Sequence, residues 1–185
     1  MELEKSTFNF KERLSRRIGA NDIYEIICLT QESNQCKQEL YKLLFEDDKT
    51  TAYQATWVFN HFSLYENKWL FDKQEELINE VLVCQHSGRR RLLLSLLYRQ
   101  PLNNPPRTDF LDFCLERMVA KNEPPAIQTL CMKLAYELCR PIPELLQEFR
   151  AIMEMTEFEL FAVSMHAARK NILKAMQKGK SLQIF

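Results

Sequence analysis

Hydrophobic side chains recur every three or four residues through almost the whole chain, the spacing of one face of an α-helix. The two-residue alternation of a half-buried strand is missing, and only 3 of the 185 residues are glycine. The pattern therefore predicts an all-α protein. It opens with a helix over residues 6–17 that ends near Gly19, followed by a short helix capped by Asn21 or Asp22.

From residue 33 onward the expected helices fall into pairs joined by short polar turns. The four pairs are expected at 33–63, 72–99, 107–140 and 143–178. Residues 1–30 would form N-terminal capping helices and 179–185 a tail, all within a single domain of 1–185. Because residues 182, 184 and 185 of that tail are apolar, we expect the tail to fold back over the last helix pair.

The turns within the pairs recur at a nearly constant interval. They lie near Asp48, Ser87, Glu123 and Thr156, which are 39, 36 and 33 positions apart. Repeats of this length, each a helix hairpin, predict a short helical solenoid. An irregular helical bundle is the alternative architecture.

Residue types at the expected helix ends agree with these divisions. Asp72, Ser87 and either Thr108 or Asp109 are good N-cap residues. Pro125 and Pro143 suit the first turn of a helix, where the missing N–H has no partner to lose.

Residues 33–178 resemble HEAT and armadillo-like repeats. A HEAT unit tends to carry an acid in the turn between its helices, then a base and an alanine early in the second helix. Asp48 and Ala55 match the acid and the alanine in the first unit, and Arg90 or Arg91 matches the base in the second. The resemblance implies a right-handed α–α superhelix of about four hairpins whose second helices line the concave face.

Charge is sorted between the two sets of helices. Lys plus Arg and Asp plus Glu both number 25, yet the expected first helices sum to −4 and the second helices to +7. A basic concave face could bind an acidic ligand. Alternatively, its bases could pair within the fold with turn acids such as Asp47, Asp48 and Glu123.

No catalytic, metal or cofactor motif stands out. The six cysteines lack a C-x-x-C pair and the three histidines are far apart, so reduced core cysteines are expected and no metal or cofactor is predicted. The N-terminus is not a signal peptide, and no apolar run approaches the ~20 residues of a membrane span. A cytoplasmic protein without membrane contact follows.

We therefore expect a non-enzymatic binding module, a monomer or weak dimer, that uses the second helices to bind a protein with an acidic segment. Arg89 to Arg91 draw attention because cations in a helix's first turn oppose its dipole and need an anion nearby. The candidate binding residues are Gln54, Arg89, Arg90, Arg91, Gln128, Lys133 and Arg169.

Two other functions remain open at this stage. The chain could bind nucleic acid, or be related to HEAT-like DNA glycosylases that excise alkylated bases and use tryptophans, an arginine and an aspartate on the concave face. Trp57 lies on an expected second helix, but no residue matches the catalytic acid of that family, and core packing also explains Trp57. The chain could also be a structural subunit of a larger assembly.

Overall fold

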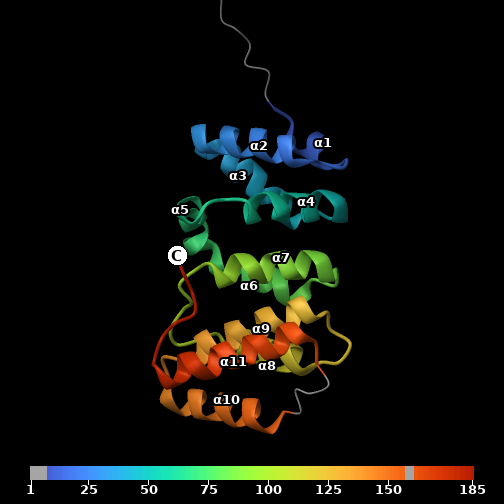
Figure 1. The fold of residues 1–185 in the computed structure, drawn as a ribbon. Helices are drawn as coiled ribbons and strands as arrows, with labels where there is room; N and C mark the ends of the chain where they lie inside the picture. Colours follow the sequence, from blue (N-terminus) through green and yellow to red (C-terminus); the bar gives the residue numbers. More distant parts are fainter. Residues whose placement is uncertain (1–7, 157–160) are drawn as a thin grey trace, which may run out of the picture. The chain divides into compact units, whose positions relative to one another are not determined.

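The computed structural model describes residues 8–156 and 161–185, and every regular element in these ranges is helical (Figure 1). The prediction of an all-α fold is therefore confirmed. The expected starts of the first helix at Ser6 and of the last helix at Glu157 lie outside the described residues. The chain divides into two compact units, with the boundary between Phe62 and Ser63.

The first unit is built around helix α4. Its elements are α1 (Phe10–Leu14), α2 (Ala20–Glu32), α3 (Asn34–Lys42), the short 3-10 helix η1 (Leu43–Phe45) and α4 (Lys49–Asn60). Helix α4 packs against α1, α2 and η1. Its apolar side buries Ala55, Val58 and Phe59, which form the core of this unit together with residues of the other helices such as Leu14 and Leu40.

The start of α2 differs from the sequence prediction. Gly19 is the N-cap of α2 rather than the end of the preceding helix. Asp22, expected as a cap, instead lies in the first turn, where its carboxylate accepts a hydrogen bond from the Gly19 N–H at 2.7 Å. This bond and the neighbouring Arg13 guanidinium lower the pKa of Asp22.

The second unit contains the three remaining helix pairs. Its elements are α5 (Leu64–Asn67), the 3-10 helix η2 (Lys68–Lys73), α6 (Gln74–Val83), α7 (Ser87–Tyr98), α8 (Thr108–Val119), α9 (Pro125–Cys139), α10 (Pro143–Met155) and α11 (Val163–Gln177). The short elements α5 and η2 lie where the sequence pattern predicted no helix.

Helix α9 is the centre of this unit. It packs against its own partner α8, against α10, and against α7 and α11 on its two sides. Ten of its fifteen residues are buried, which agrees with contacts on several faces. The second helices α7, α9 and α11 are thus successive neighbours, as the repeat pattern predicts (Figure 1).

Several predicted N-caps are displaced by one residue. Helix α7 is capped by His86, not Ser87: the His86 Nδ1 accepts a hydrogen bond from the Arg89 N–H at 3.0 Å. Arg107 precedes α8 and Lys73 precedes α6, so Thr108 and Asp72 are not the caps. Pro125 and Pro143 do open α9 and α10, as predicted.

Gly179 ends the last helix and redirects the chain. Its φ of 59° lies in the left-handed region, and the Lys180 N–H donates to the Ala175 carbonyl at 3.0 Å. The following segment folds back, but not over the last helix pair as predicted. It contacts α9 and α7 instead, because Tyr136 and Tyr98 on those helices hold its main chain.

Candidate interaction surface

The structure separates the seven predicted binding residues into buried and accessible groups. Gln54, Arg90 and Gln128 are buried, Arg89, Lys133 and Arg169 are half-buried, and Arg91 is exposed. Gln54 belongs to the first unit, whereas the other six lie on α7, α9 and α11 of the second.

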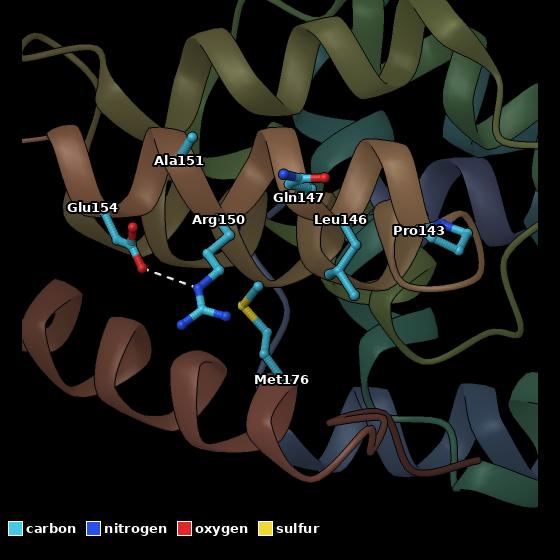
Figure 2. Close-up of a pocket in the computed structure, with 7 residues that line it drawn as sticks. All are labelled: Pro143, Leu146, Gln147, Arg150, Ala151, Glu154 and Met176. Atoms are coloured by element: carbon cyan, nitrogen blue, oxygen red, sulfur yellow. Dashed lines mark hydrogen bonds and ion pairs between the residues drawn. The ribbon is translucent and has the colours of Figure 1, made fainter.

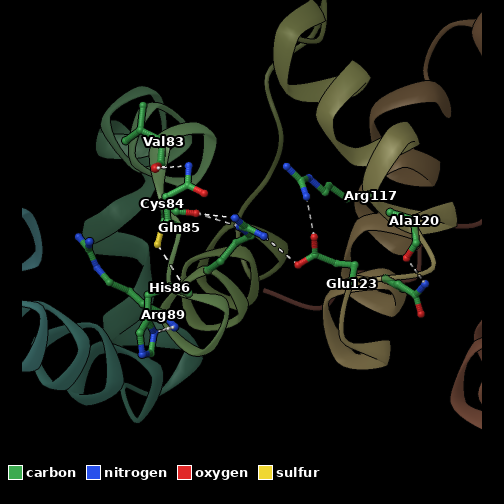
Figure 3. A network of polar contacts seen from close by, with 10 residues as sticks. Val83, Cys84, Gln85, His86, Arg89, Arg117, Ala120 and Glu123 are labelled. Atoms are coloured by element: carbon green, nitrogen blue, oxygen red, sulfur yellow. Dashed lines mark hydrogen bonds and ion pairs between the residues drawn. The ribbon is translucent and has the colours of Figure 1, made fainter.

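Arg90 forms part of an internal ion-pair network with Glu123 and Arg117. Figure 3 shows the Glu123 carboxylate and its contact with Arg117. The Arg90 Nη1 donates to Oε1 of Glu123 at 2.8 Å, and its Nε and Nη2 donate to the Cys84 carbonyl at 3.0 and 2.6 Å. The second carboxylate oxygen of Glu123 accepts from Arg117 at 2.9 Å. The side chains of Arg90 and Glu123 are only 7% and 4% exposed, so Arg90 is a structural residue and its assignment as a binding residue is corrected.

Gln54 and Gln128 are also occupied within the fold. The Gln54 amide donates to the Leu14 and Arg16 carbonyls and accepts from the Ile18 N–H, which fixes the chain between α1 and α2. The Gln128 amide donates to the Ala120 carbonyl at the end of α8. Both were predicted as contact residues, and burial removes both from any accessible surface.

Arg89 is neutralised by a carboxylate on the adjacent helix of its own pair. Its Nη1 lies 2.9 Å from Oε1 of Glu80, and its side chain is 12% exposed. The two arginines nearest the positive end of the α7 dipole are therefore offset by Glu80 and Glu123. The alternative expectation, that bases of the second helices pair with turn acids, holds for Arg90 and Glu123.

Arg169 lies on the side of α11 that faces α10, where its Nε donates to the Met153 carbonyl at 3.1 Å. At about 100° per residue, Asn171, Lys174 and Lys178 lie on the opposite side of the helix. All three are exposed. The sequence pattern did not single out Lys174 and Lys178, although they lie three and seven residues after Asn171, a spacing that places all three on one side of a helix.

Matching stripes of accessible residues follow α7 and α9 at the same spacing. The Lys133 ammonium on α9 lies 5.5 Å from the centre of the Tyr98 ring on α7, which places the two stripes next to each other. We call the combined surface the second-helix face. Its residues are Arg91, Ser95, Tyr98, Leu130, Lys133, Arg140, Asn171, Lys174 and Lys178.

The second-helix face carries cations without matching anions. Four of its cations, Arg91, Lys133, Lys174 and Lys178, form no salt bridge with any residue in the described ranges. Glu137 is the one acid within α7, α9 and α11, and its side chain is 1% exposed.

Formal charge separates the two sets of helices even more clearly with the observed boundaries. Helices α6, α8 and α10 carry −3, −2 and −2, whereas α7, α9 and α11 carry +3, 0 and +3. The sorting of charge predicted from the sequence is thus present in the second unit.

A groove between α10 and α11 is a second candidate site (Figure 2). It has a volume of about 580 Å³, and its polar residues include Arg150 and Glu154, which pair with each other at 3.0 Å. The other lining residues are Pro143, Leu146, Gln147, Ala151 and Met176. Its one carboxylate, that of Glu154, is engaged by Arg150, and the groove therefore offers no pair of groups for acid–base or nucleophilic chemistry.

Metal ligands do not cluster in the part of the chain that the structure describes. No group of three His, Cys, Asp or Glu side chains there is arranged to hold an ion. The six cysteines are free, and Cys84, Cys114, Cys131 and Cys139 are buried. Burial raises the pKa of Cys114 well above its usual value and that of Cys139 to about 12, so both stay as thiols.

The repeated helix pairs, with their second helices as successive neighbours, define a helical-repeat protein. The family model described as HEAT repeat domain matches residues 10–176, and the chain belongs to this family. The match begins earlier than the resemblance over 33–178 suggested, so it includes the N-terminal helices that were expected to act as caps. The chain matches none of the curated proteins and none of the solved structures with which it was compared.

HEAT repeats are helical scaffolds that commonly mediate protein interactions through extended surfaces, and they are typically non-catalytic. Within residues 8–156 and 161–185, no helix is long and apolar enough to cross a membrane.

Proposed function

We propose that this chain is a cytoplasmic, non-enzymatic binding module whose second-helix face receives an acidic segment of a partner protein. The observation that carries the proposal is the set of four accessible cations that form no salt bridge with the residues that the structure describes, on or next to helices whose one acid is buried. Arg89, Arg90 and Arg169 are left out of the binding surface because groups within the fold already engage them.

An acidic ligand would relieve an unfavourable arrangement of charge. Lys174 and Lys178 are four residues apart on one helix, where like charges cost roughly 0.2–0.5 kcal/mol per pair. Carboxylates of a partner would remove this repulsion and would also speed the encounter by electrostatic attraction. Tyr98 and Leu130 add apolar area between the cations.

Protein is favoured over nucleic acid as the partner. Proteins that bind duplex DNA tightly often make roughly 6–10 phosphate contacts, more than the four free cations provide. The neutral net charge gives no overall attraction for an extended polyanion, and the acidic helices α6, α8 and α10 would repel one.

Charge reversal on the second-helix face tests this function. Arg91→Glu with Lys133→Glu should weaken binding of a short fluorescein-labelled Glu-rich peptide by at least about tenfold, because each reversal changes a surface charge interaction by ~1–2 kcal/mol. Fluorescence anisotropy at physiological salt measures the Kd. Thermal melting should be almost unchanged, since neither cation has an internal anion.

The matched control reverses two exposed lysines away from this face, Lys68→Glu and Lys121→Glu. It has the same net charge as the test variant and should keep most of the peptide affinity. Equal losses in the two variants would mean that only net charge matters and would contradict a defined site. Tighter binding of a duplex DNA than of the peptide would assign the face to nucleic acid.

A further inference from the structure

The segment Lys180–Phe185, which follows the turn at Gly179, lies on the second unit as an extended peptide lies on a receptor. Three hydrogen bonds join its main chain to side chains of α7 and α9. Tyr136 Oη donates to the Lys180 carbonyl at 2.6 Å, Tyr98 Oη donates to the Leu182 carbonyl at 3.0 Å, and the Leu182 N–H donates to Oε1 of Glu137 at 2.5 Å. The donors and acceptors of the receptor thus come from α7 and α9.

Two side chains of the segment are held as specifically as its main chain. The Ser181 hydroxyl donates to Oε2 of Glu137 at 2.9 Å. The Gln183 amide donates to the carbonyls of Tyr98 and Gln100, each at 2.8 Å. Carbonyls at the end of a helix lack partners within it, and a primary amide has the two N–H groups needed to reach two of them.

The receptor side of these contacts is buried when the segment is in place. The side chain of Glu137 is 1% exposed and also accepts a hydrogen bond from Arg140 at 3.0 Å. Burial and the nearby Glu137 carboxylate raise the pKa of Tyr98 to about 12, so its phenol remains a donor at neutral pH. A buried carboxylate beside two phenols recognises the N–H, hydroxyl and carbonyl groups of an extended chain.

An apolar contact completes the binding mode at the far end of the segment. The ring of Phe185 meets that of Phe71 on η2 edge to face, with 6.3 Å between the ring centres. The segment therefore presents, in order, a hydroxyl, an apolar residue, an amide and an aromatic ring.

We propose that Tyr98, Gln100, Tyr136 and Glu137 form a peptide-binding site, which the chain's own Lys180–Phe185 segment fills and which accepts an extended segment of the same chemistry from a partner protein. That chemistry is a serine or threonine, an apolar residue, a glutamine and, two residues later, an aromatic ring. The site shares Tyr98 with the second-helix face, but its recognition rests on hydrogen bonds to Tyr98, Tyr136 and Glu137 rather than on the four cations of that face.

A synthetic peptide supplied in trans tests the site. In the full chain with residues 181–185 replaced by glycine, the receptor residues remain but the side chains of the internal ligand are gone. This glycine variant should bind a labelled peptide of the sequence Lys180–Phe185. The wild-type chain should bind it at least tenfold more weakly, because the tethered segment competes at a high effective concentration. Anisotropy titrations give both affinities.

Two substitutions in the glycine variant separate recognition from non-specific adsorption. Glu137→Gln replaces one acceptor oxygen by an N–H donor and should abolish peptide binding, whereas Glu148→Gln on α10, an exposed carboxylate, should leave it intact. A peptide with glutamine changed to alanine should bind at least tenfold more weakly.

A second variant, Gln183→Ala with Phe185→Ala, keeps the main-chain contacts of the segment. Its affinity for the labelled peptide should lie between those of the wild-type chain and the glycine variant. This variant provides the test if the glycine variant does not fold. Absence of peptide binding in both folded chains would overturn the proposal, and so would undiminished binding after Glu137→Gln. A wild-type chain that dimerises through this segment, and loses the dimer in the glycine variant, would assign the site to a second copy instead.

Discussion

Replacing Glu123 by glutamine is expected to lower the free energy of unfolding by about 3–5 kcal/mol, because it leaves the Arg90 guanidinium buried without a counter-charge. The carboxylate holds Arg90 and Arg117 at 2.8 and 2.9 Å. Two hydrogen bonds from Arg90 to the Cys84 carbonyl persist in the variant, but they do not neutralise the charge. Urea unfolding followed by circular dichroism measures the change.

An exposed ion pair supplies the control for this prediction. Arg150 and Glu154 form a salt bridge at 3.0 Å in which both side chains are 57% exposed. Glu154→Gln should therefore cost less than about 1 kcal/mol. If Glu123→Gln lowered the free energy of unfolding by the same small amount, the Arg90–Glu123 pair would not be structural. Arg90 would then again be a candidate contact residue.

Stability should decline at alkaline pH, by several kcal/mol in total between pH ~9 and ~12. Burial raises the pKa of Cys139 from 9.0 and that of Tyr98 from 10.0, both to about 12, and raises the pKa values of Cys114 and Tyr136 as well. The unfolded chain loses these protons first as pH rises. Their stabilising contribution is thus fully present below pH ~9 and is lost as pH rises through the folded-state values.

Urea unfolding at a series of alkaline pH values measures this decline. Tyr98→Phe and Cys139→Ala each remove one of the titrating groups, so each variant should show a shallower loss than the wild-type chain. An unfolding free energy that stays constant up to pH ~11 would contradict the burial of these groups.

The helix pairs could be predicted from the sequence because apolar spacing reports the buried side of each helix directly. Helix ends were harder to predict. His86 caps α7 although Ser87 is the commoner cap type, because the cap is set by main-chain geometry and by which side chain reaches the Arg89 N–H. Gly19 likewise begins α2 instead of ending α1.

The candidate surface was predicted in part. The sorting of charge between first and second helices follows from the sequence alone. Arg91 and Lys133 are accessible residues of second helices, and their role in binding stays a prediction. Which arginines were already neutralised could not be predicted, since the partner of Arg90 is 33 positions away and depends on how one pair packs on the next. The peptide-like contacts of Lys180–Phe185 were missed because Glu137 resembles an ordinary surface acid in the sequence.

Chemical-shift mapping by NMR can show, residue by residue, whether the second-helix face binds an acidic protein segment. Titration of the Glu-rich peptide into the isotope-labelled chain should shift amide signals around Arg91, Lys133, Lys174 and Lys178. Signals of α6, α8 and α10 should stay in place. Shifts confined to those three helices, or no shifts at saturating peptide, would contradict the account.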